Sequence, residues 1–232
     1  MPIVKLLHGT DHMIKTPDFL LGKPHNDYGK GFYCTEDIEM AREWACKENK
    51  DGFVNEYRFN TDGLNVLNLL DGKHTVLNWI ALLLKNRIFT LQDPIAVDAR
   101  NYIMEHYSID LSHYDVVIGY RADDSYFSYA QAFIGNALPL RSLSQALKLG
   151  KLGKQTALIS KHAFDRLEFV KAEAVNKKIY YPKFLSRDTS ARAAYQKKTK
   201  GSLAYRDDIF VMDILREGIQ NDDPRIQRII LE

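Results

Sequence analysis

The chain has 232 residues, of which 45% are hydrophobic and 27% charged, the balance of a soluble globular protein with one large domain or a domain and an appendage. Its formal net charge of +2 lacks the strong basic excess that is typical of nucleic-acid-binding proteins. The two cysteines, Cys34 and Cys46, form no CxxC pair, so neither a disulfide framework nor a metal site is predicted.

The first third of the chain alternates short strands with loops and one helix. Thr35 is followed by acidic residues and then by apolar residues at helical spacing, so we expect a helix capped by Thr35. In chain order the sequence predicts a strand over residues 2–8, an irregular loop over 10–28, an aromatic strand over 31–35, this helix, a strand over 53–59, and an apolar run over 64–70 that pairs near it.

Residues 74–107 predict two helical segments, the second starting at Asp93 and Pro94, and we interpret this block as a helical insertion. After it we expect a buried strand at 114–120, helices at 125–134 and 142–149, a strand at 155–160, a short helix or turn at 161–167 and a strand at 169–175. Strands and helices do not alternate regularly, which favours an α+β fold with an antiparallel or split sheet over a doubly wound parallel sheet. We assign residues 1–175 to one domain and 176–232 to a basic, helical C-terminal extension.

No apolar run approaches the roughly 20 residues needed to cross a bilayer, and the first residues do not resemble a signal peptide. We therefore expect a cytoplasmic protein without a membrane partner.

The tripeptide His8, Gly9 and Thr10 ends the first predicted strand. A histidine there can donate a hydrogen bond to a ribose hydroxyl, and a glycine lets the backbone approach a ligand closely. The alternative is a histidine at the edge of the strand whose hydrogen bonds are made within the protein.

Residues 29–33 read Gly-Lys-Gly-Phe-Tyr, and Trp44 follows in the predicted helix. Strand alternation puts Phe32 and Tyr33 on opposite faces, so one ring can serve the core and the other a cleft. A flat nicotinamide ring is well held between two aromatic planes, for which Tyr33 and Trp44 are candidates. The alternative is that all three aromatic residues belong to the core.

Taken together, His8 with Gly9 and the stretch from Gly29 through Gly31 to Tyr33 resemble the ADP-ribosyltransferases of the diphtheria-toxin and poly(ADP-ribose) polymerase branch. These have a His-Gly on the first strand, a Gly-x-Gly-x-Tyr strand and a catalytic Glu on a late strand. The resemblance implies a split antiparallel sheet and NAD as substrate. It also implies that His8 contacts the adenosine ribose, that the Gly9 backbone binds the carboxamide, and that Tyr33 and Trp44 sandwich nicotinamide.

The chain is still more similar to an uncharacterised bacterial family of this superfamily. Shared features are the His-Gly-Thr start, the sequence Asp-Tyr-Gly-Lys-Gly-Phe-Tyr at 27–33, the Ala-x-x-Trp-Ala helix at 41–45, and a strand followed by Ala-Asp-Asp at 116–124. The resemblance covers about residues 3–175, and the stretch 27–45 is its most specific part.

Gln155 is a departure from that pattern, because it stands where the polymerase branch has its catalytic glutamate. Glutamine keeps a hydrogen bond to the ribose but supplies no negative charge, and losing such help typically costs on the order of 10²–10³ in rate. Either the enzyme is a mono-transferase that manages without the acid, or another acid substitutes, or the site binds NAD without turnover. Candidate substitutes are Asp123, Asp124 and, less well placed, Glu168.

Arg121 and Asp123 follow the predicted buried strand, where a loop is a good position for a site. Arg121 could meet the NAD diphosphate with its planar fork, and Asp123 could either face NAD or cap the next helix. The basic segment 136–153 corresponds to the acceptor loop of such transferases, which would suit an acidic or nucleic-acid acceptor; basic residues also cluster over 177–200, where a solvated face is the alternative.

The leading hypothesis is a cytoplasmic bacterial mono-ADP-ribosyltransferase, a toxin or defence effector, that modifies a protein or nucleic acid and is countered by an antitoxin protein. A second is a non-catalytic NAD or ADP-ribose binding module on the same fold. A third is an interaction protein whose aromatic motifs are only core.

Overall fold

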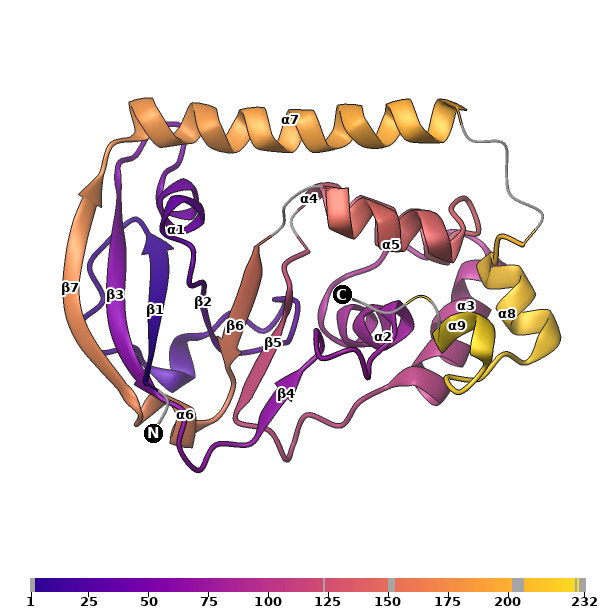
Figure 1. Cartoon of the computed structure of the whole chain (residues 1–232), viewed down its shortest axis with the longest axis horizontal. Coiled ribbons are helices and arrows are strands. Elements are labelled where there is room, and N and C mark those ends of the chain that lie inside the picture. The colour runs from indigo at the N-terminus through magenta and orange to yellow at the C-terminus, as the bar shows by residue number, and fades with distance from the viewer. Residues whose placement is uncertain (1–2, 123, 150–152, 202–206, 228, 230–232) are drawn as a thin grey trace.

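A computed structural model describes residues 3–122, 124–149, 153–201, 207–227 and 229 of the chain (Figure 1). The fold is α+β, as the sequence predicts. The strands are β1 (Ile3–Thr10), β2 (Phe32–Cys34), β3 (Gly52–Asn60), β4 (Val66–Asn68), β5 (Val116–Tyr120), β6 (Lys154–Leu158) and β7 (Leu167–Val175). The helices are α1 (Ile38–Ala45), α2 (Val76–Asn86), α3 (Pro94–Tyr107), α4 (Asp124–Ile134), α5 (Leu140–Leu149), α6 (Lys161–Phe164), α7 (Lys177–Gly201), α8 (Val211–Glu217) and α9 (Pro224–Gln227), with a 3₁₀ turn at Phe19–Leu21.

The strands form two sheets that stand side by side in Figure 1. The first has the order β1-β3-β7 and is antiparallel; the second has the order β2-β6-β5-β4 and is mixed, because β4 runs parallel to β5. The expectation that residues 64–70 pair near the strand at 53–59 is therefore wrong, since Val66 pairs with Val116 instead. Both edges of β3 are already used by β1 and β7, which leaves no place for a further strand beside it.

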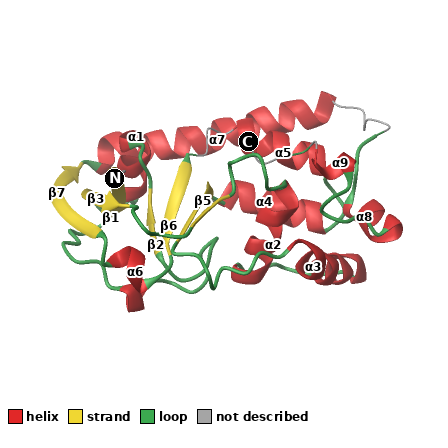
Figure 2. Cartoon of the chain, turned by 60° about the horizontal axis from the view of Figure 1, so that its bottom comes forward, coloured by secondary structure: helices red, strands yellow, loops and turns green. Residues whose placement is uncertain are grey.

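Helices cover the second sheet and form the largest core with it. Helix α2 buries every residue over 76–84, and these side chains pack with Val117 of β5 and Ala157 of β6. Val211 and Ile214 of α8 belong to the same core. The helices at 74–107 and those near the C-terminus thus share one apolar interior with the second sheet, and Figure 2 shows them gathered at the opposite end from the first sheet.

Helix α1 begins two residues later than the sequence predicts. Its N-cap is Asp37, whose carboxylate accepts hydrogen bonds from the N–H groups of Glu39 and Met40. Thr35, the predicted cap, is buried and pairs through its backbone with Leu7 of β1. The helix ends at Ala45, so Trp44 lies in its last turn.

Helix α7 runs along both halves of the molecule (Figures 1 and 2). Its first turns pack on α1, where Arg187 Nε donates to Glu43 Oε2 at 2.7 Å and Lys183 Nζ to Glu39 Oε2 at 2.8 Å. Within the described residues, no helix combines the length and the apolar character that a membrane span requires.

Candidate functional site

The two sheets meet where β1 and β2 come together. Leu7 and Thr35 exchange two backbone hydrogen bonds, of 2.8 and 2.9 Å, and form an isolated bridge between the strands. On one side of this bridge β1 pairs with β3, and on the other side β2 pairs with β6 of the second sheet. The predicted site residues of β1 and β2 therefore lie next to the junction of the sheets.

His8 follows the bridge directly and places its ring against β2. Its Nδ1 lies 2.7 Å from the backbone oxygen of Tyr33, and its ring stacks on Phe32 with centroids 4.3 Å apart. Burial lowers the pKa of His8 to about 4, so the ring is neutral near pH 7. Because a carbonyl oxygen can only accept, Nδ1 carries the proton and Nε2 is left with a lone pair.

This arrangement corrects the role expected for His8. The sequence suggests a donor to a ribose hydroxyl, but a neutral ring that donates from Nδ1 to Tyr33 can only accept a hydrogen bond at Nε2. Contact with a ribose therefore requires the sugar hydroxyl to donate to His8.

Two glycines of the motifs are required by backbone packing. A Cβ on Gly9 would lie 2.0 Å from the backbone oxygen of Ala41 in α1, and a Cβ on Gly31 would lie 2.6 Å from the oxygen of Leu158 in β6. Thr10 ends β1, half-buried, in register with Phe53. The glycines thus let α1 and β6 approach the strands that carry His8 and Tyr33, and binding of a carboxamide by the Gly9 backbone stays a prediction.

Tyr33 is fixed by its hydroxyl group. The hydroxyl donates to the backbone oxygen of Gly29 at 2.6 Å and accepts from the N–H of Tyr28 at 3.0 Å. The ring is half-buried and nearly parallel to that of Tyr28, with centroids 6.5 Å apart. Burial raises the pKa of Tyr33, so the phenol stays protonated and offers an aromatic surface rather than a base.

Trp44 and Arg121 are brought together although they lie in different elements. The Cζ atom of Arg121, which follows β5, lies 4.6 Å from the centroid of the half-buried Trp44 ring. This is cation–π geometry. One face of the indole is thus covered by a guanidinium group in this structure.

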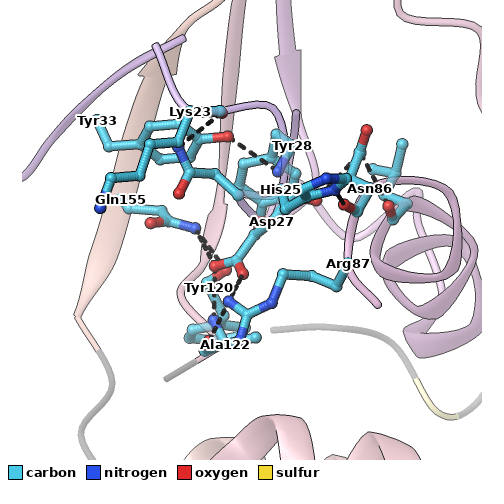
Figure 3. A network of polar contacts seen from close by, with 12 residues as sticks. Lys23, His25, Asp27, Tyr28, Tyr33, Asn86, Arg87, Tyr120, Ala122 and Gln155 are labelled. Carbon is cyan, nitrogen blue, oxygen red and sulfur yellow. Dashed lines mark hydrogen bonds and ion pairs between the residues drawn. The ribbon is translucent and has the colours of Figure 1, made fainter. Parts of the chain in front are cut away.

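Gln155 lies at the start of β6 and is buried, with 3% of its surface exposed. Its Nε2 donates to Asp27 Oδ2 at 2.9 Å and to the backbone oxygen of Tyr120 at 3.2 Å (Figure 3). Tyr33 pairs with Ala157, two residues along β6, so Gln155 and Tyr33 share one face of the sheet.

Asp27 and Arg87 extend this candidate site, although the sequence patterns did not single them out. Asp27 is 3% exposed; its Oδ1 accepts from Arg87 Nη1 at 2.9 Å and its Oδ2 from the N–H of Ala122 at 2.8 Å. Burial raises the pKa of Asp27 above its ordinary value, and the hydrogen bonds of Ala122 and Gln155 and the charges of Arg87 and Arg121 offset this only in part. The sequence signal that could have identified Asp27 was its position in the motif at 27–33. Arg87, which follows α2, lies in no motif that would have identified it.

Of the acids considered as substitutes for a catalytic glutamate, Glu168 does not meet Gln155. Glu168 lies exposed on β7, 3.6 Å from Arg58, in the other sheet and on the strand farthest from β2. Asp124 is the first residue of α4, and Asp123 lies outside the described residues. The described acid that contacts Gln155 is Asp27.

The described part of the basic segment at 136–153 contains the helix that the sequence predicts at 142–149. This helix is α5, and its Arg141 donates to Asp207 Oδ2 at 2.7 Å. No group of three or more metal-ligating side chains is assembled in the described part of the chain.

A family model described as a protein of unknown function (DUF3990) matches residues 4–169, which include the described site residues. No curated protein and no solved structure matches the chain.

Proposed function

The chain belongs to the DUF3990 family, whose function is unknown, and we propose that it is an NAD-dependent mono-ADP-ribosyltransferase. NAD would be the substrate, and a protein or nucleic acid would accept the ADP-ribose. The observation that carries the proposal is that two strands with motif residues meet at the junction of the sheets, where His8 bonds the backbone of Tyr33 and Tyr33 shares a sheet face with Gln155.

Each residue has a role that suits its environment. The faces of Tyr33 and Trp44 would hold nicotinamide, and His8 Nε2 would accept a hydrogen bond from the adenosine ribose. Arg121 would leave Trp44 and bind the diphosphate with its planar fork. The Gln155 oxygen would accept a hydrogen bond from a hydroxyl of the nicotinamide ribose.

The reaction breaks the bond between ribose C1 and the nicotinamide nitrogen. The bonding electrons leave with nicotinamide, which becomes neutral, and the ribose acquires oxocarbenium character. A nucleophile of the acceptor then attacks C1 and releases its proton to solvent. A protein without a carboxylate at position 155 lacks the usual charge stabilisation, so we expect transfer of single ADP-ribose units rather than polymer growth.

The second candidate is a binding module for NAD or ADP-ribose that does not turn the ligand over. The observation in its favour is Gln155, whose amide is already held by Asp27 and Tyr120 and carries no charge.

One experiment separates the two candidates. The protein is incubated with labelled NAD and a bacterial lysate, nicotinamide release and label transfer are followed, and NAD binding is measured by calorimetry. Release together with transfer supports the transferase, and binding without release supports the binding module. If neither binding nor release is detected, both candidates are wrong. A Trp44→Ala variant with an unchanged circular dichroism spectrum serves as the control and should lose NAD binding.

A further inference from the structure

Asp27 is a buried carboxyl group that the proposed reaction does not use. Its carboxylate is contacted by three segments of the chain, through Arg87 after α2, the N–H of Ala122 after β5, and Gln155 on β6. All three groups donate hydrogen bonds, which favours the ionised carboxylate. A buried carboxylate with this many donors holds the segments that carry them in fixed positions.

The contacts of Gln155 determine which way its amide points. Both partners of Nε2, the Asp27 carboxylate and the Tyr120 carbonyl, are acceptors, so the –NH₂ group must face them. Figure 3 shows the amide nitrogen on the Asp27 side and the amide oxygen on the opposite side of the group. The oxygen is then the part of Gln155 that can accept a hydrogen bond from a sugar hydroxyl.

The same contacts disfavour a glutamate at position 155. A glutamate side chain in this conformation would place an anionic oxygen about where Nε2 now lies, 2.9 Å from Asp27 Oδ2 and 3.2 Å from the oxygen of Tyr120. Two carboxylates at that separation cannot both ionise at low cost, and one pKa is strongly raised. The acid at position 27 and the amide at position 155 are therefore complementary.

We propose that Asp27 is a positioning residue, which orients Gln155 so that its amide oxygen serves as the acceptor for the nicotinamide ribose, with Arg87 holding the carboxylate in place. This inference rests on the proposed function, because it names the residue through which Gln155 acts. An asparagine at position 27 can donate as well as accept, so it no longer imposes one orientation on Gln155.

The orientation can be tested without turnover by NMR of the Gln155 side-chain amide, assigned from its loss in Gln155→Glu. In the wild-type protein both N–H signals should exchange slowly with solvent, and they should shift in Asp27→Asn. The matched control is Asp115→Asn, which changes a carboxylate bonded to Ser160 and Asn65 just before β5 and should leave the signals in place. If the Gln155 amide protons of the wild-type protein exchange with solvent at the rate of a free amide, the proposal is wrong. This measurement does not depend on whether any variant folds.

Steady-state kinetics provide a second test of the positioning role. In a protein that releases nicotinamide, Asp27→Asn should lower kcat on the order of 10–100-fold with a smaller change in KM for NAD, because a misplaced acceptor costs mainly transition-state stabilisation. Gln155→Glu should add an ionisation to the pH profile of kcat, and combining it with Asp27→Asn should move that ionisation to lower pH, because the neighbouring carboxylate is gone. If Asp27→Asn leaves kcat unchanged, the positioning role is wrong. If the wild-type protein neither binds nor cleaves NAD, the proposed function is wrong, and the NMR result alone then decides the orientation of Gln155.

Discussion

The guanidinium group of Arg121 lies over the indole ring of Trp44, with Cζ 4.6 Å from the ring centroid. The pyridinium ring of NAD is also a flat cation, so the same aromatic face suits both groups. They cannot occupy it together, because they would overlap and repel. We therefore infer that NAD binding on this face displaces Arg121.

Displacement of Arg121 predicts a change in Trp44 fluorescence when NAD binds. A nicotinamide stacked on the indole should quench its emission, whereas Trp79 is fully buried and should contribute a constant background. The measurement is a fluorescence titration with NAD. A Trp44→Phe variant keeps an aromatic face but should show no quenching, and equal quenching in that variant would place NAD elsewhere.

Arg121→Ala should weaken NAD binding by about 10–100-fold, because a charge-assisted contact to a phosphate is worth roughly 1.5–3 kcal/mol. The measurement is calorimetry with NAD and with nicotinamide alone. Nicotinamide has no diphosphate, so its affinity should not fall. Equal loss for both ligands would contradict a role of Arg121 at the diphosphate.

The low pKa of His8 predicts a loss of stability in acid. Unfolding returns the group from a pKa of about 4 to its ordinary value of 6.5, so the unfolded chain binds the extra proton between these pH values. The stability that neutral His8 contributes is thus complete above pH 6.5 and declines as the pH falls towards 4, by about 3 kcal/mol in total. Urea denaturation at pH 7, 5.5 and 4 measures this loss. His8→Asn should show a correspondingly smaller loss over that range, and parallel profiles for the two proteins would show that His8 is not the group responsible.

Gly9→Ala should destabilise the fold by about 3 kcal/mol or more, because the new Cβ would meet the Ala41 backbone of α1 and neither element can move freely. The matched control is Gly135→Ala, where the nearest atom to a Cβ is 3.5 Å away and the change should stay within about 0.5 kcal/mol. Urea denaturation measures both. Equal stability of the two variants would contradict the close packing of α1 on β1.

Two ion pairs between α7 and α1 should differ in strength. Arg187 and Glu43 are 19% and 11% exposed, whereas Lys183 and Glu39 are each 49% exposed. A partly buried pair loses more when one partner is removed than a solvated pair does. Arg187→Ala should therefore speed hydrogen exchange at the start of α7 about tenfold or more, and Lys183→Ala much less. The reverse order would show that α7 is held by other contacts.

The candidate site residues that the sequence could single out lie in continuous motifs. His8, Gly9, Gly31 and Tyr33 are in such motifs, and the expected strands and helices around them form with shifts of one or two residues at their ends. Local patterns suffice there because strand alternation and helical spacing are properties of neighbouring residues.

The contacts between distant segments could not be predicted in this way. Asp27 and Gln155 are 128 positions apart, and Arg87 meets Asp27 only because α2 packs under the second sheet. The pairing of β4 with β5 likewise depends on a tertiary neighbour, because both edges of β3 are already paired with other strands. The tautomer of His8 depends on the carbonyl oxygen of Tyr33. Charge, burial and orientation of a side chain are set by such neighbours rather than by its own segment.

The most direct test of the central claim is a crystal structure of the protein soaked with NAD. The account predicts nicotinamide on the face of Trp44 with Arg121 moved to the diphosphate, His8 Nε2 at the adenosine ribose, and the Gln155 oxygen at the nicotinamide ribose. NAD bound away from the junction of the two sheets, with Arg121 still stacked on Trp44, would contradict it.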